Sequence, residues 1–145
     1  MLENDTLVFS SEKNSYIRDD LAQNWPQFKA KLAGIAKDNK GRSIVDVRFM
    51  FGEGRLRSRS VLTSVVLLTR DTSKPPFTKL SVKDALSFIT KNDFCNPHQL
   101  VRTKEKQEER KQFFAELFKR VPIYLLNTIE TPKESLERVK ALLGD

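Results

Sequence analysis

Two long apolar runs constrain the fold of this chain most strongly, "VLTSVVLLTR" at residues 61–70 and "VPIYLLNT" at residues 121–128. Both are rich in β-branched and aliphatic residues and almost free of charge, which is typical of strands buried on both faces. Patterns of helical periodicity precede, separate and follow them. The sequence therefore predicts an α/β or α+β fold, in which a mixed β-sheet is flanked by helices in a single layered domain over residues 1–145.

Loop and capping signals separate the first apolar run from the next helix. Residues 71–77, "DTSKPPF", are predicted to form a loop, because two prolines do not fit a central strand. Ser81 can cap a helix over residues 82–93, with Asp84 placed for a capping box. Residues 94–98, "FCNPH", are expected to break this helix, since the residue before a proline is disfavoured in helical geometry.

Two further helices are predicted near the C-terminus. Residues 103–120 show the clearest helical pattern, with a highly charged first half and an apolar face in the second. Thr131 as N-cap, followed by Pro132 and Glu134, marks the start of the last helix. The apolar side chains expected to face the core from these helices are Phe113, Phe114, Leu117, Phe118, Leu136, Val139 and Leu143.

The N-terminal part alternates short strand and helix patterns. Residues 5–10 are predicted to form a strand, and "NSYIR" at residues 14–18 either continues it or forms its hairpin partner. Helical character begins near Asp19 or Asp20, is interrupted at Pro26, and resumes over "WPQFKAKLAGIAKD". The alternation in "SIVDVRFMF", residues 43–51, predicts another strand.

A glycine- and arginine-rich segment, "RFMFGEGRLRSRS" at residues 48–60, is called the arginine stretch below. It is predicted to be a tight turn between two strands, with Arg55, Arg57 and Arg59 pointing to one side at i, i+2 and i+4. A solvated hairpin would produce this pattern. Three like charges on one face are also suited to a phosphate or another anion, and to nucleic acid. These three interpretations stay open at the level of sequence.

Charge and composition restrict the partners. The formal net charge of +7 favours anionic partners, such as nucleic acid, phosphorylated molecules or acidic proteins. The single cysteine, Cys95, and single histidine, His98, exclude an internal disulfide and a Cys/His zinc cluster. No run approaches the ~20 apolar residues of a membrane span, and the start of the chain lacks a signal-peptide pattern. We therefore expect a cytoplasmic protein with no membrane partner.

No complete catalytic motif is present. The glycines of the arginine stretch are not followed by the Lys-Ser/Thr of a Walker A loop, and "GEG" is too short for a dinucleotide fingerprint. With one histidine and no nucleophile signature, hydrolase triads have no support either. The chain is not predicted to be a complete enzyme on its own.

Several segments, taken in order, resemble P-loop kinases related to HPr kinase and to ATP-dependent phosphoenolpyruvate carboxykinase. Each motif is weak alone, and their order makes the resemblance more specific across most of the chain. The segments are "ENDTLVF" with "SEKNSYIRDDL", "FGEGRL" with "SVVLLTRD", and "NPHQLV" followed by a charged helix and "PIYLLNTIETPKE".

The resemblance implies a nucleotide-binding kinase-like fold that uses Mg²⁺ and ATP for phosphoryl transfer. Asp5 would match the acidic residue that holds the metal or activates a substrate hydroxyl, although Asn4 replaces a second acid that the family often has. Arg18 and Arg55 match arginines of the family and could meet phosphates, together with Arg57 and Arg59 of the arginine stretch.

The phosphate-binding loop of that family would precede Met1. We therefore expect the chain to be the C-terminal portion or a subunit of a larger kinase-like protein, contributing an arginine-lined anion surface. Mg²⁺ and ATP would bind only with a partner chain or segment that carries the loop. The alternative is a small, basic, non-enzymatic module that binds nucleic acid or an acidic protein.

Overall fold

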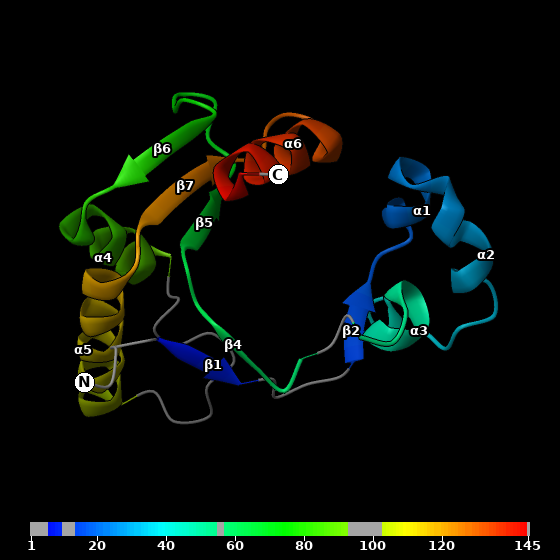
Figure 1. The fold of residues 1–145 in the computed structure, drawn as a ribbon, viewed down its shortest axis with the longest axis horizontal. Helices are drawn as coiled ribbons and strands as arrows, with labels where there is room; N and C mark the ends of the chain where they lie inside the picture. Colours follow the sequence, from blue (N-terminus) through cyan, green and yellow to red (C-terminus); the bar gives the residue numbers. More distant parts are fainter. Residues whose placement is uncertain (1–5, 10–13, 55–56, 93–102, 145) are drawn as a thin grey trace. The chain divides into compact units, whose positions relative to one another are not determined.

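The computed structural model describes residues 6–9, 14–54, 57–92 and 103–144. It has the predicted α+β character, with short helices, two-stranded ribbons and a mixed three-stranded sheet flanked by helices (Figure 1). Its contacts group into two compact units. The N-terminal unit is Leu7–Val61, and the C-terminal unit runs from Leu62 onward and includes Thr6.

The C-terminal unit is built on a sheet with strand order β5 (Val65–Thr69), β7 (Ile123–Asn127), β6 (Phe77–Leu80). The central strand β7 runs parallel to β5 and antiparallel to β6 (Figure 1). Four of the five β7 residues are buried, which confirms the prediction for this run. Strand β6 is an addition to the prediction, because Phe77 had been placed in the preceding loop.

Three helices complete this unit and begin where the sequence predicts. Helix α4 (Val82–Lys91) starts at Ser81, whose hydroxyl accepts from the backbone N–H of Asp84. Helix α5 (Lys104–Arg120) starts at Thr103, and α6 (Pro132–Leu143) starts with a complete capping box between Thr131 and Glu134. The predicted break at 94–98 lies outside the described residues.

The core of this unit lies between the sheet and the pair α4 and α5. It is formed by Ala85, Ile89, Phe118 and Ile123. Phe113 and Leu136 were expected to face a core, but they are exposed, because the buried face of α5 is centred on Phe118 and α6 turns Leu136 toward solvent. The side chain of Leu143 lies outside the described set.

The apolar run 61–70 does not form one strand. It divides into the end of β4 (Arg59–Val61) and the whole of β5, with residues 62–64 between them. The break coincides with the boundary between the two units. Among the described residues, strand β5 pairs with β7 alone, and its Leu68 side chain is 57% exposed, so the prediction of burial on both faces is wrong for β5.

Two separate antiparallel ribbons organise the N-terminal unit. Strand β1 (Leu7–Phe9) pairs with β4, and β2 (Asn14–Ile17) pairs with β3 (Ser43–Asp46). Residues 14–18 therefore neither continue β1 nor form its hairpin partner. Each N-terminal strand pairs with a strand that comes much later in the chain.

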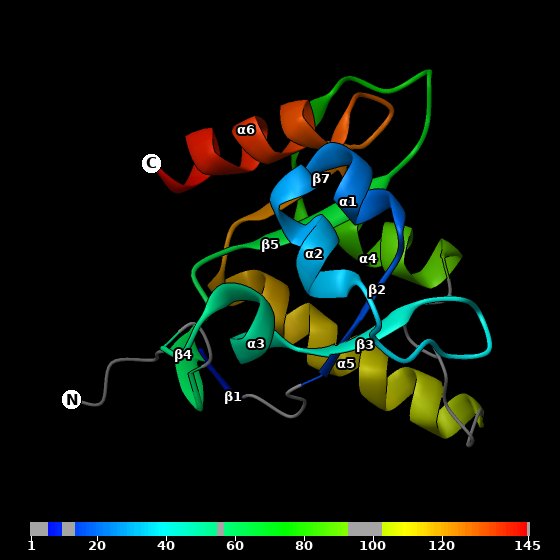
Figure 2. The same ribbon diagram turned by 90° about the vertical axis from the view of Figure 1, so that its right-hand side faces the viewer.

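Short helices follow β2 and β3 within the N-terminal unit (Figure 2). They are α1 (Asp20–Asn24), the 3-10 helix η1 (Pro26–Phe28), α2 (Lys29–Leu32) and α3 (Val47–Phe51). The interruption at Pro26 is confirmed. The helix predicted to reach residue 38 ends at Leu32, because Ala33 is extended and Gly34 has a φ of 76°.

The strand predicted over residues 43–51 also ends early, at Asp46. The Asp46 carboxylate accepts from the Arg48 N–H and so caps α3, while Gly52, with a φ of 97°, ends that helix. The arginine stretch thus starts as a helix, and β3 and β4 pair with different strands. The predicted hairpin turn is therefore wrong. No helix in the described ranges is long and apolar enough to cross a membrane.

Candidate anion-binding surface

The three described arginines of the arginine stretch, Arg48, Arg57 and Arg59, have different environments. Arg48 lies in α3 and makes a two-pronged contact with Asp46, at 3.1 Å from Nε to Oδ1 and 2.6 Å from Nη2 to Oδ2. These hydrogen bonds raise the pKa of the Arg48 guanidinium above its ordinary value. Arg48 is therefore already neutralised within the chain and is a poor candidate for an external anion.

Arg57 and Arg59 are both exposed. Arg59 is the first residue of β4, and Arg57 lies two residues before it. Within the described ranges, neither forms an ion pair with an acidic side chain. Only Arg59 belongs to a strand, so strand geometry does not align the two side chains as the sequence predicted. They remain two residues apart in the sequence, on either side of a bend at Ser58, and both present a planar guanidinium group to solvent.

Arg18 is the other predicted site residue that the structure describes, and it does not lie on the β1–β4 ribbon. Arg18 is exposed and follows β2, which pairs with β3 rather than with β4. Asp5 and Arg55 lie outside the described residues, so their predicted roles stay predictions. The candidate surface therefore reduces to Arg57 and Arg59, with Arg18 at the end of the other ribbon.

Arg57 and Arg59 have no acidic partner in the described part of the chain, which distinguishes them from several other arginines. Arg42 contacts Asp38 at 2.6 Å, and Arg138 contacts Glu130 at 2.6 Å. Hydrogen bonds from the backbone and side chain of Arg42 lower the pKa of Asp38. Hydrogen bonds from the side chain of Arg138 lower the pKa of Glu130. Among the described residues, carboxylates thus pair with arginines elsewhere but not with Arg57 or Arg59.

Apolar side chains accompany the arginines on the β1–β4 ribbon. Phe9 lies directly opposite Arg59 in the register, and Leu7 lies opposite Val61. Because alternate residues of a strand share a face, these four side chains lie on one side of the ribbon. Phe9 is 72% exposed, and the other three are exposed as well.

A buried amide organises the carboxyl ends of β5 and β7, which the sequence interpretation missed. Asn127 is fully buried; its Nδ2 donates to the carbonyl oxygens of Asp71 and Lys74 at 2.6 and 3.0 Å, and its Oδ1 accepts from the Asp71 N–H at 3.1 Å. These bonds hold the loop that follows β5. A polar residue at the end of a strongly apolar run was the available signal.

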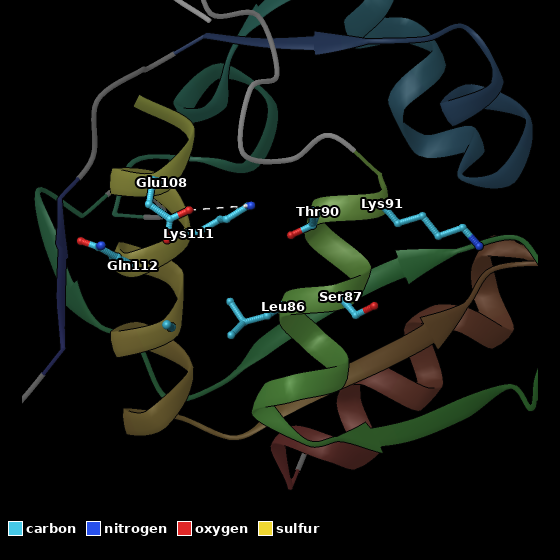
Figure 3. A pocket seen from close by; sticks show the side chains of 8 residues that line it. Leu86, Ser87, Thr90, Lys91, Glu108, Lys111 and Gln112 are labelled. Carbon is cyan, nitrogen blue, oxygen red and sulfur yellow. Dashed lines mark ion pairs between the residues drawn. The ribbon is translucent and has the colours of Figure 1, made fainter. Parts of the chain in front are cut away.

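A cleft of about 550 Å³ lies between α4 and α5 (Figure 3). Leu86 points from α4 toward α5, while Glu108 and Lys111 on α5 form an ion pair of 3.9 Å at the opposite wall. Ser87, Thr90 and Gln112 add polar groups. The lining is mixed in charge, so it does not form a second concentrated anion site.

The predicted metal ligand, Asp5, lies outside the described residues. In the ranges that the structure describes, no three His, Cys, Asp or Glu side chains gather into a group that could hold a metal ion. The Mg²⁺ and ATP expectations depend on Asp5 and on a phosphate-binding loop from elsewhere, and they stay predictions. No protein-family model, curated protein or solved structure matches this chain.

Proposed function

We propose that this chain is the C-terminal segment or a subunit of an HPr-kinase/carboxykinase-like phosphotransferase and contributes an arginine-lined anion surface. The observation that carries the proposal is the exposure of Arg57 and Arg59 without an acidic partner among the described residues. Arginine binds phosphate through a planar fork of donors, and two such groups only two residues apart favour a polyanionic ligand.

In the reaction, the arginine-lined surface would position phosphate groups and neutralise their negative charge. Phosphoryl transfer depends mainly on the placement of phosphate oxygens and on the stabilisation of their charge. Arg57 and Arg59 would hold phosphate oxygens that a partner chain, carrying the phosphate-binding loop, presents to them. Asp5 would supply the acidic group of the same site, and Mg²⁺ with ATP would enter only in that assembly. We place the assembly in the cytoplasm, in keeping with the single cysteine.

Calorimetric titration of inorganic tripolyphosphate into the full chain tests the anion surface. We expect the double variant Arg57→Ala/Arg59→Ala to weaken binding by about tenfold or more, since charge-assisted hydrogen bonds are the strong ones. Arg120→Ala, at an exposed position at the end of α5, removes one charge from the other unit and should leave affinity within about twofold. Equal losses of affinity in both variants would mean that binding depends on the overall positive charge of the chain and not on Arg57 and Arg59.

The alternative function is a basic module that binds nucleic acid. The exposed Phe9 beside Arg59 favours it, since base stacking on an aromatic next to a cation is typical of single-strand binding. A salt series with a random single-stranded oligonucleotide separates the two. Nucleic-acid binding should weaken steeply as salt rises, whereas no binding at low salt would remove this alternative.

A further inference from the structure

The β1–β4 ribbon has the properties of an unfinished sheet. It has three residues in each strand, and in the part of the chain that the structure describes neither strand has a second neighbour. All six residues are exposed. Isolated two-stranded ribbons are marginal in water, and a third strand or a covering face is normally needed for stability.

The backbone register shows which groups face the free edge of β4. Leu62 donates its N–H to the Thr6 carbonyl at 2.8 Å, in register with the Leu7–Val61 pair. Hydrogen-bonded and non-hydrogen-bonded pairs alternate in an antiparallel ladder. Val8 and Ser60 therefore form the next hydrogen-bonded pair, and the backbone N–H and C=O groups of Arg59 and Val61 point away from β1.

The side chains at the same edge specify the chemistry of a partner. Arg59 lacks an acidic neighbour in the described ranges, and Val61, two residues along the same face, is an exposed apolar group. A strand laid along β4 would place an acidic residue beside Arg59 and an apolar residue two positions away, beside Val61. Arg57 would favour a second acid if pairing extended toward it.

We propose that the free edge of β4 is completed by an extended, acidic and apolar segment of a partner polypeptide. The inference deepens the proposed function, because it states how the partner chain would attach. Backbone hydrogen bonds from Arg59 and Val61 give affinity, and the alternation of acidic and apolar side chains gives register. Val61 loses exposed apolar surface to the apolar side chain that the segment places beside it.

Two other occupants fit less well. A second copy of this chain would bring together two proteins that each carry a formal charge of +7, with arginine meeting a basic surface. A nucleic acid would find one aromatic platform, Phe9, among the aliphatic side chains of Leu7, Val8 and Val61. Charge and side-chain type together favour an acidic polypeptide.

Fluorescence anisotropy with the full chain tests the proposal. The labelled peptide carries glutamate and valine in turn at every second position, with threonine between them, so that glutamate and valine share one face of the strand. We expect saturable binding, reduced about tenfold by Arg59→Glu and also by a proline at the centre of the peptide, which cannot donate to the ladder. The same peptide with lysine in place of glutamate should show the reverse preference and bind Arg59→Glu better than the wild type.

A variant that removes a backbone N–H distinguishes strand pairing at β4 from anion binding by Arg57 and Arg59. Val61→Pro removes one outward N–H of β4 while retaining Arg57 and Arg59, so peptide binding should fall about tenfold and tripolyphosphate binding should stay within about twofold. Circular dichroism checks that the variant folds, and Arg59→Glu provides the independent variant. The proposal would be overturned if the proline-containing peptide bound as tightly as the parent peptide, or if single-stranded RNA bound more tightly than the peptide. Dimerisation of the chain through the same edge of β4 would also overturn it.

Discussion

Asn127 provides a prediction whose magnitude can be worked out from the structure. Its side chain is 0% exposed and makes three hydrogen bonds to the backbone of Asp71 and Lys74, at 2.6 to 3.1 Å. Each is worth about 1 kcal/mol net, and removal leaves its partner groups partly buried and unpaired. We therefore expect Asn127→Ala to lower the free energy of unfolding by about 3 kcal/mol.

Urea denaturation followed by circular dichroism measures this loss. Asn92→Ala is the matched control, because Asn92 makes one exposed side-chain bond, from Nδ2 to the Phe88 carbonyl at 2.8 Å. It should cost less than about 1 kcal/mol. If Asn127→Ala cost no more than the control, the bonds to the loop would not stabilise the C-terminal unit, and our account of that loop would be wrong.

Substitution by aspartate gives the same prediction a pH dependence. Asn127→Asp keeps an oxygen to accept from the Asp71 N–H but turns a charged oxygen toward two backbone carbonyls. Burial and this repulsion raise the pKa of the new carboxyl, so the variant should gain stability as pH falls and the carboxyl becomes a donor. A variant whose stability relative to wild type is independent of pH would refute this reasoning.

Three further predictions concern the C-terminal unit. Ile89→Ala, at a core side chain that is 1% exposed, should cost about 2–5 kcal/mol in denaturation, whereas Leu68→Ala at the exposed edge should cost under about 1 kcal/mol. Thr131→Ala should cost about 1 kcal/mol through loss of the capping box, and comparable stability of the variant would contradict the cap. The hydrogen bond from the Arg138 side chain lowers the pKa of Glu130, so this pair stabilises the fold above pH 4.5, the ordinary pKa of Glu130. That stabilisation is lost as the pH falls through the lowered pKa. The difference in the free energy of unfolding between wild type and Arg138→Gln should therefore shrink in acid.

Local sequence signals predicted the helices of the C-terminal unit well. Ser81, Thr103 and Thr131 each cap the helix that follows them, because capping is decided within a few residues of the chain. The apolar run that became β7 was also recognisable, since a central strand is buried on both sides.

Strand pairing in the N-terminal unit could not be predicted in this way. The pairing of β1 with β4 joins residues 50 to 54 positions apart, and no turn motif between them specifies it. Residues 47–51 alternate like a strand, but the Asp46 cap and the positive φ of Gly52 make them a helix. The candidate surface was found only in part, since neither the Arg48–Asp46 pair nor the free edge of β4 follows from composition or spacing.

NMR observation of the arginine side-chain Nε–Hε groups would test the central claim most directly. We predict that tripolyphosphate, added to the full chain, shifts the signals of Arg57 and Arg59 first and most strongly. The signals of Arg48 and Arg138, which already pair with carboxylates, should stay nearly in place. Shifts of similar size at all exposed arginines, or none at Arg57 and Arg59, would contradict the proposal of a dedicated anion surface.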